Sequence, residues 1–274
     1  MKPRPFDYVR PETVDEAVAI LAEHGDDARV LAGGQTLLAM LNLRVVEPVV
    51  LVDITRIGEL GHIREVDGKI EVGAAVTQNR LLSWPALAEK LPLLSVALPF
   101  VGHFQTRNKG TVCGSVAHAD PTSEIPLSLA LLEGEVVLRS QRGTRVLPAA
   151  EFQQGMLATA REPDELVAAV RFPVVKGGVA FREVARRHGD FAIVGVAALV
   201  EGKGTIRLGV AGMVERPSVS RLEADSPDAI RDAVERLAWE LEGYDDVHAS
   251  ARMRRDLLRG IGPAVIEEAI RCAV

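Results

Sequence analysis

The sequence predicts an α+β protein of two domains, residues 1–175 and 176–274. In the first domain, short apolar runs typical of strands alternate with segments of helical periodicity. The stretch from Val174 to Gly178 ends in two glycines and is the best candidate for the domain boundary. Beyond it, three strand-like runs come first and helices follow, as in an α+β architecture. With 274 residues, 47% of them hydrophobic, the chain can form two hydrophobic cores.

Residues 1–56 predict a small βαβ-like subdomain. Thr13-Val14-Asp15-Glu16 has the pattern of a capping box, which opens a helix, and Gly25 ends that helix. A strand follows at about 28–32, and a buried strand spans 49–54. The residues on the apolar face of the helix are Val14, Ala17, Val18 and Leu21.

Residues 57–175 predict a second subdomain that is richer in strands. Asp67-Gly68 is a strong hairpin signal between apolar runs, and Thr77 caps a short helix. Pro85 and Pro92 interrupt a helical stretch that reaches about residue 100. The other expected elements are strands over 63–66, 69–74, 135–140, 144–147 and 165–172, and a helix over 126–132.

The C-terminal segment predicts a three-stranded antiparallel sheet followed by helices. The turn Gly202-Lys203-Gly204 joins the last two strands. Ser226 and Pro227 suit the N-cap and first position of a helix that reaches about residue 241. The expected strands span 179–185, 192–201 and 205–213, and two more helices span 250–259 and 263–272.

A glycine pair interrupts the chain after the strand at 28–32. The apolar run Val30–Ala32 meets Gly33-Gly34, Thr36 supplies a hydroxyl, and a helical apolar run follows. Glycines allow the backbone to approach a phosphate closely, and helix N-termini attract anions. The stretch is neither a P-loop nor the G-x-G-x-x-G dinucleotide motif, and such a turn is also ordinary punctuation between two elements.

A second stretch, residues 110–126, is rich in small and hydroxyl side chains. Neither the helical nor the strand period fits it, so we expect an irregular loop over 101–124 that closes over the other side of one diphosphate. His118, Asp120 and Glu124 could alternatively be metal ligands, but their spacing in a loop is a weak metal signal. Asp120 before Pro121 is typical of a turn.

Composition excludes several classes of function. The net charge of −6 and the 4% aromatic content argue against nucleic acid as the main partner. No apolar run is long enough for a membrane span, and the N-terminus lacks a signal-peptide core. Cys113 and Cys272 cannot supply the four thiolates of an ordinary [2Fe–2S] cluster, and we expect two reduced thiols in a cytoplasmic protein. No G-x-S-x-G or H-E-x-x-H motif occurs, so neither catalytic nor metal-binding residues are predicted.

Three motifs together resemble one family. A-G-G-Q-T-L-L at 32–38, T-x-x-G-S-x-A-H-A-D-P-x-x-E at 111–124 and R-R-H-G-D-F-A at 186–192 resemble the FAD-binding medium subunit of molybdenum hydroxylases. This family includes carbon monoxide dehydrogenase, xanthine dehydrogenase and dehydrogenases of N-heteroaromatics such as nicotine and quinoline. The resemblance covers the whole chain. It implies a PCMH-type, vanillyl-alcohol-oxidase-like FAD-binding domain with subdomains 1–56 and 57–175, followed by the C-terminal domain.

The resemblance also implies a set of residues that bind FAD. Loops 31–37 and 111–115 would wrap the diphosphate, Glu124 would meet the ribityl or adenosine part, and Phe191 would lie beside the isoalloxazine ring. Arg182 falls where animal xanthine enzymes carry a lysine near the flavin. The full set is Leu31, Ala32, Gly33, Gly34, Gln35, Thr36, Leu37, Val101, Thr111, Cys113, Gly114, Ser115, Ala117, Asp120, Glu124, Val167, Arg182 and Phe191.

Each of the more distant positions has a structural alternative. Val101, Val167 and Phe191 could be core residues, and Arg182 with the Arg186-Arg187 pair could be a solvated edge. The family usually has two glycines at 113–114, whereas this chain has Cys113. Either the backbone differs there, because cysteine lacks access to positive φ, or the small side chain is tolerated.

The function implied by the resemblance is electron transfer, since a flavin carries its own redox chemistry. A large partner subunit with the molybdopterin cofactor would hydroxylate the substrate, and a small [2Fe–2S] subunit would pass electrons to FAD in this chain. FAD would pass them to a terminal acceptor, in a dimer of heterotrimers. The 186–192 motif favours an N-heteroaromatic substrate, with carbon monoxide or another small substrate as the alternative. A stand-alone FAD oxidoreductase and a non-enzymatic nucleotide-binding module also remain open.

Overall fold

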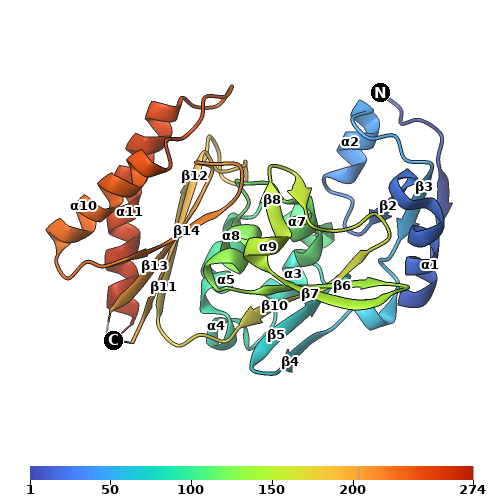
Figure 1. Cartoon of the computed structure of the whole chain (residues 1–274), viewed down its shortest axis with the longest axis horizontal. Coiled ribbons are helices and arrows are strands. Elements are labelled where there is room, and N and C mark those ends of the chain that lie inside the picture. The colour runs from blue at the N-terminus through green and yellow to red at the C-terminus, as the bar shows by residue number, and fades with distance from the viewer. Residues whose placement is uncertain (203, 274) are drawn as a thin grey trace.

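The computed structural model describes residues 1–202 and 204–273, which form three parts along the long axis of the molecule (Figure 1). A parallel sheet with strand order β1-β3-β2 lies at the N-terminal end. An antiparallel sheet with order β4-β5-β10-β6-β7 lies in the middle, and an antiparallel sheet with order β11-β12-β13-β14 lies at the other end. No helix in the described ranges combines the length and hydropathy that crossing a bilayer requires.

The N-terminal part confirms the predicted helix and its cap. Thr13 Oγ1 accepts a hydrogen bond from the backbone N–H of Glu16 at 3.2 Å, and all four residues of the predicted apolar face are buried. Gly25, with φ of +50°, ends the helix. The elements of this part are β1 (Asp7–Val9), α1 (Val14–His24), η1 (Gly25–Asp27), β2 (Ala28–Leu31), α2 (Leu37–Leu43) and β3 (Val50–Asp53).

The middle part contains the five predicted strands, and helices cover the sheet. Asp67 and Gly68 both have positive φ, as the predicted hairpin requires. Thr77 caps the short helix after it through a bond from the Arg80 N–H. The elements are η2 (Gly58–Leu60), β4 (Ile63–Val66), β5 (Lys69–Gly73), α3 (Gln78–Leu82), α4 (Leu87–Lys90), α5 (Pro92–Ala97), η3 (Leu98–Phe100), α6 (Phe104–Lys109), α7 (Val112–His118), α8 (Glu124–Leu131), β6 (Glu135–Ser140), β7 (Gly143–Pro148), α9 (Ala149–Phe152), β8 (Gln153–Gly155), β9 (Ala158–Thr159) and β10 (Leu166–Pro173).

The prediction of an irregular loop over 101–124 is wrong, because α6 and α7 lie within it. Helix α7 buries Val112, Cys113 and Val116, which follow helical spacing. The other face of α7 carries small side chains instead of charged ones. The usual contrast between an apolar and a polar face is therefore missing, and the sequence hides the helical period.

The C-terminal part differs from prediction in two ways. The sheet has a fourth strand, β14, whose Ser-Val-Ser-Arg-Leu sequence lies at the edge and is only half-buried, so its strand signal is weak. A single helix runs through Pro263, where two helices were expected. The elements are β11 (Gly178–Val184), β12 (Val194–Glu201), β13 (Thr205–Ala211), β14 (Ser218–Leu222), α10 (Pro227–Glu240) and α11 (Ala251–Cys272). Of the predicted turn at 202–204, Lys203 lies outside the described residues.

The long helix α11 continues through Pro263 because packing against neighbouring elements stabilises it. Four residues of α11 are fully buried against the sheet and α10: Leu258, Val265, Ile266 and Ala269. Burying each such side chain contributes about 1.5–3 kcal/mol, except for alanine, and together they offset the roughly 3 kcal/mol cost of an internal proline.

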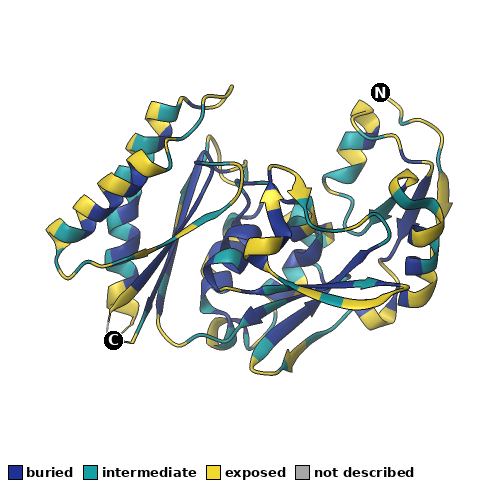
Figure 2. Ribbon diagram, in the orientation of Figure 1, coloured by how far each residue is buried: buried dark blue, intermediate teal, exposed yellow. Residues whose placement is uncertain are grey.

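The four-stranded sheet belongs to two hydrophobic cores. On β12, Val196 and Ala198 pack in the core formed with α10 and α11, whereas Ala197 and Leu199 pack in the core of the middle part. An added Cβ at Gly209 would lie 2.9 Å from Leu127 Cδ1, so the glycine lets α8 approach the sheet closely. Figure 2 shows the two central strands, β12 and β13, as buried along most of their length. The predicted domain limits at 56 and 175 stay predictions.

Two neighbouring glycines test the packing of α11. An added Cβ at exposed Gly260 meets nothing within 4 Å, whereas one at Gly262 would lie 2.9 Å from Val234 Cγ1 on α10. Gly260→Ala should stabilise the protein by about 1 kcal/mol through helix propensity and raise Tm by about 2–4 °C. Gly262→Ala should lower Tm, because α10 must shift. Thermal unfolding of both variants checks this, and equal shifts would contradict it.

Candidate functional site

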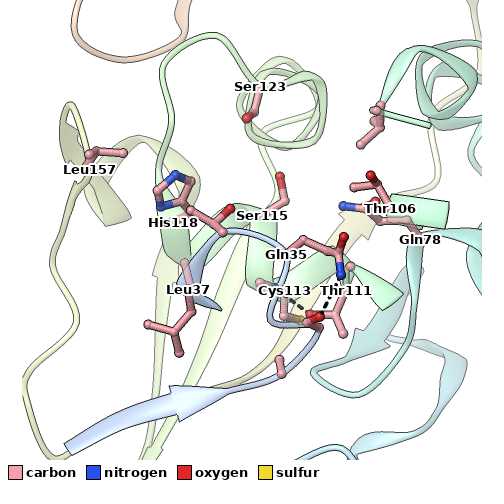
Figure 3. Close-up of a pocket in the computed structure, with 18 of the residues that line it drawn as sticks. Gln35, Leu37, Gln78, Thr106, Thr111, Cys113, Ser115, His118, Ser123 and Leu157 are labelled. Atoms are coloured by element: carbon pink, nitrogen blue, oxygen red, sulfur yellow. Dashed lines mark hydrogen bonds between the residues drawn. The ribbon is translucent and has the colours of Figure 1, made fainter. Parts of the chain in front are cut away.

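A cavity of about 940 Å³ lies where the three parts meet. This volume is at the upper end of the range of small-molecule sites. The segment after β2, helix α7 and strand β10 form much of its wall, and the 186–193 segment of the C-terminal part lines one end. Figure 3 shows side chains of the first two segments pointing into the same space.

The two glycine-containing loops meet backbone against backbone. An added Cβ at Gly33 would lie only 2.6 Å from Gly110 Cα, and closer still to the carbonyl oxygen of Lys109. Gly34 has φ of +70°, a conformation that other residues rarely adopt. Gly33 is therefore required by the close approach of the Lys109–Gly110 backbone, and Gly34 is required by the positive φ of the turn. The two glycines do more than separate a strand from a helix.

The second loop opens helix α7. The Thr111 side chain accepts a hydrogen bond from the Gly114 N–H at 3.0 Å, and an added Cβ at Gly114 would lie 2.7 Å from Thr111 Oγ1. Cys113 has no positive φ, and its buried thiol donates to the Val72 carbonyl at 3.3 Å. Burial raises the pKa of this thiol. The cysteine is thus tolerated without backbone strain, one of the two outcomes that the sequence left open.

The structure brings most of the predicted site residues together around the cavity. Three predicted residues do not line it: Leu31, Asp120 and Arg182. Asp120 instead accepts hydrogen bonds from the Thr122 N–H and hydroxyl at 2.8 and 2.6 Å, which confirms the predicted turn. The predicted residues that line the cavity are Ala32, Gly33, Gly34, Gln35, Thr36, Leu37, Val101, Thr111, Cys113, Gly114, Ser115, Ala117, Glu124, Val167 and Phe191.

Arg182 lies on the opposite face of the sheet from the cavity. Its guanidinium pairs with Glu268 on α11 at 2.7 Å and is half exposed, so the solvated-edge alternative holds for this residue. Arg186 and Arg187, in contrast, line the cavity. Phe191 is 67% exposed at the rim, which contradicts the alternative that it is a core residue.

Other cavity residues come from separate elements and gave no signal in the sequence. Arg29 and Arg161 line one region, and burial together with the nearby Arg29 charge lowers the pKa of Arg161. Arg254 lines another and is 1% exposed. It donates to the carbonyls of Ile193 and Gly212 at 2.6 and 2.8 Å, and its ion pair with Asp246 is 2.6 Å long. No contiguous motif marks these residues, because the fold alone assembles them.

Two carboxyl groups lie at the junction between α8 and the four-stranded sheet. Burial, with the nearby Asp120 charge, raises the pKa of Glu124 to about 7. Burial and the Glu124 charge together raise the pKa of Glu183 to about 8. Oε2 of Glu183 is buried and accepts no hydrogen bond from the residues described. Burial lowers the pKa of His118. Within residues 1–202 and 204–273, no three histidine, cysteine or acidic side chains converge as metal ligands.

The raised pKa of Glu183 predicts a pH-dependent stability. The folded protein favours the neutral acid, so its contribution is complete below the ordinary pKa of 4.5 and is lost as pH rises through about 8. Glu183→Gln stays neutral, so its Tm should fall less than that of the wild type between about pH 5 and pH 9. Exposed Glu23→Gln is the control and should keep the wild-type slope. Parallel curves for wild type and Glu183→Gln would rule out the ionisation of Glu183 as the cause.

Two close-packed glycine turns in the wall of one large cavity are typical of a site for an extended, phosphate-containing cofactor. The family model described as "FAD binding domain in molybdopterin dehydrogenase" matches residues 4–175. The chain belongs to this family, the FAD-binding medium subunits of molybdenum hydroxylases. It is thus the FAD subunit of a molybdenum-dependent oxidoreductase, which confirms the family predicted from the three motifs.

The relatives include proteins that match over the full chain. The chain is 35% identical to the 6-hydroxypseudooxynicotine dehydrogenase complex subunit alpha of Paenarthrobacter nicotinovorans, covering 100% of this chain and 97% of the relative. It is 38% identical to the carbon monoxide dehydrogenase medium chain of Hydrogenophaga pseudoflava, covering 74% and 72%. The solved structure of quinoline 2-oxidoreductase from Pseudomonas putida 86 superposes with a TM-score of 0.93 at 33% identity, over 99% of each chain. The predicted fold class is thereby confirmed.

Proposed function

We propose that the chain binds FAD in this cavity and transfers electrons from the [2Fe–2S] clusters of a small partner subunit to an outside acceptor. The observation that carries the proposal is the contact of Gly33 with Lys109 and Gly110, which sets two backbone turns against each other in the cavity wall. Backbone at both turns can reach a diphosphate from two sides, because no side chain stands between. The cavity is also large enough for an extended dinucleotide.

The direction of FAD in the cavity is part of the proposal. Phe191 at the rim and the 186–193 segment mark the end that is open to partners, and electrons must enter and leave there. The isoalloxazine ring, which supplies the redox chemistry when FAD is bound, belongs at that end. The adenosine belongs near Arg29 and Arg161, at the region lined by β2 and the segment after β9.

The residues of this chain bind and orient, and none acts as an acid or base on a substrate. The two turns would hold the diphosphate, Val101 and Val167 would give apolar contact, and Glu124 would meet the ribityl or adenosine part. Arg254 keeps the 186–193 segment in position, since it lines the cavity and donates to the Ile193 carbonyl. Arg182 is not part of this proposed site, because its ion pair lies on the other face of the sheet.

The partners follow from the relatives. A large molybdopterin subunit would hydroxylate the substrate and a small [2Fe–2S] subunit would relay its electrons, in a dimer of heterotrimers. An N-heteroaromatic substrate is supported by the names of two relatives, 6-hydroxypseudooxynicotine dehydrogenase and quinoline 2-oxidoreductase. Carbon monoxide dehydrogenase medium chains are also relatives, and carbon monoxide is the second candidate. A cytoplasmic location agrees with the free thiols of Cys113 and Cys272.

The contact between the two turns gives a direct test of FAD binding. Gly33→Ala places a Cβ against the Lys109–Gly110 backbone and should separate the turns, so the protein should purify with little or no flavin. Gly58→Ala is the matched control, since its Cβ meets nothing within 4 Å and it lies outside the cavity lining. Flavin absorbance per chain, measured after purification with added FAD, checks both variants. Full flavin content in Gly33→Ala would refute the assignment of the turns.

Phe191 tests the direction of the bound cofactor. Because its side chain is 67% exposed, Phe191→Ala should leave Tm nearly unchanged. Loss of stacking on the ring should weaken FAD binding by about two- to tenfold and speed reoxidation of the reduced flavin by oxygen. Stopped-flow reoxidation and FAD titration give the two readouts. Unchanged values in both would remove Phe191 from the flavin site.

A further inference from the structure

The side-chain amide of Gln78 is buried in the cavity wall, and its oxygen has no hydrogen-bond partner among the described residues. Gln78 is the first residue of α3, it lines the cavity, and it is only 5% exposed. Its Oε1 is buried and receives no hydrogen bond from residues 1–202 and 204–273. A buried polar atom without a partner is costly, so such an atom in a binding cavity indicates a group that the ligand supplies.

The backbone around Gln78 is tied to the second glycine-containing loop. The Gln78 N–H donates to the Gly110 carbonyl at 2.8 Å, and the Val112 N–H donates to the Val76 carbonyl at 3.1 Å. Thr77 and Thr111 form a β-bridge between these two bonds. The amide lies against Gly110, where an added Cβ would be 3.1 Å from Oε1. The backbone of Gln78 is therefore fixed against the second glycine-containing loop, and its amide packs against Gly110 in the cavity wall.

A chain of contacts links Gln78 to the end of the cavity that Phe191 marks. Gly110 also lies beside the Thr106 carbonyl, and an added Cβ at Gly102 would lie 3.1 Å from the Thr106 side chain. Gly102 in turn meets Gly189, where an added Cβ would lie 2.9 Å from the Gly102 carbonyl oxygen. Gly189 precedes Phe191 by two residues. In Figure 3, Gln78 lies beside Thr106, and its amide nitrogen points toward the open space.

The chemistry of a primary amide suits one edge of the isoalloxazine ring. The pyrimidine edge presents a carbonyl, the N3–H and a second carbonyl in sequence. A glutamine amide offers a donor and an acceptor side by side, and its broad terminal torsion lets either atom face the ligand. An adenine ring would also suit an amide, but the proposed adenosine region, at Arg29 and Arg161, is formed by other elements.

We propose that Gln78 is a positioning residue that holds the isoalloxazine ring of FAD by its pyrimidine edge. Its Nε2 donates to a ring carbonyl, and its Oε1 accepts from N3–H after rotation of the terminal torsion. This inference rests on the proposed FAD site, and it adds a residue outside both glycine-containing loops. It also gives the orphaned Oε1 the donor that the chain itself does not supply.

The test is a double-mutant cycle between the protein and the flavin. Dissociation constants of FAD and 3-methyl-FAD, which lacks the N3–H, are measured for wild type and Gln78→Leu by quenching of flavin fluorescence. Wild type should bind FAD about two- to twelvefold more tightly than 3-methyl-FAD, as expected for one hydrogen bond. Gln78→Leu should bind both flavins equally. Gln78→Met repeats the measurement in case Gln78→Leu folds poorly, and the Tm of each apo variant is recorded.

Gln35→Met is the matched control for the amide. Gln35 lies in the same cavity, and its Nε2 donates to the Gly33 carbonyl at 3.3 Å, in the diphosphate turn. This variant should keep the wild-type preference for FAD over 3-methyl-FAD, even where its overall affinity falls. The preference should therefore disappear only when the amide at position 78 is removed.

Other outcomes overturn the inference in recognisable ways. Equal weakening of both flavins by Gln78→Leu would mean that Gln78 only supports the Gly110 backbone. A preference against FAD with a 1,N6-etheno adenine that disappears in Gln78→Leu would place adenine at this amide. Failure of the wild-type chain to bind FAD would refute the proposed function itself, whereas a wild type that binds FAD and 3-methyl-FAD equally refutes only the role of Gln78.

Discussion

The contact between Gly33 and the Lys109–Gly110 backbone is the constraint on which the rest of the site depends. It brings a turn of the N-terminal parallel sheet against a turn of the middle part with no side chain between them. Any Cβ at position 33 would force the two apart, because the atoms it would meet belong to the backbone and cannot rotate away. Gly33 and Gly110 both line the cavity, so the same contact joins two parts of the protein and positions two donor-rich turns.

A second constraint is the sheet that both hydrophobic cores share. Alternate residues of β12 enter the core with α10 and α11 and the core of the middle part, so the C-terminal part cannot swing freely from the cavity. This close packing also explains the unusual carboxyls. Glu183 follows Phe181 by two residues on β11 and shares its face of the strand, toward the middle part, where Glu124 begins α8. Burial on both sides therefore disfavours the charged forms.

Sequence reasoning worked where a signal is local and failed where the fold decides. The hairpin at Asp67-Gly68 and the cap at Thr13 need only a few neighbouring residues, and both are as predicted. Helix α7 was not predicted because its small side chains face a cavity and not water, so the helix has no polar face in the sequence. The single helix through Pro263 depends on packing partners more than 20 residues away in the chain. Arg182 was placed near the flavin by resemblance, yet the alternation of β11 turns it to the opposite face, toward Glu268.

The cavity lining extends beyond the part of the chain that the FAD-binding family model matches. This difference distinguishes residues for diphosphate binding from residues that cover the ring in the proposed site. The match to the family model ends at residue 175, and both glycine-containing turns lie within the matched residues. The 186–193 segment and Arg254 lie beyond it and still line the cavity. Diphosphate affinity can thus come from the first two parts alone, while the third part covers the end where the redox ring is proposed to lie. Because Arg254 and the shared sheet hold that segment, access to the ring in the proposed site would depend on rim side chains such as Phe191 rather than on movement of the whole part.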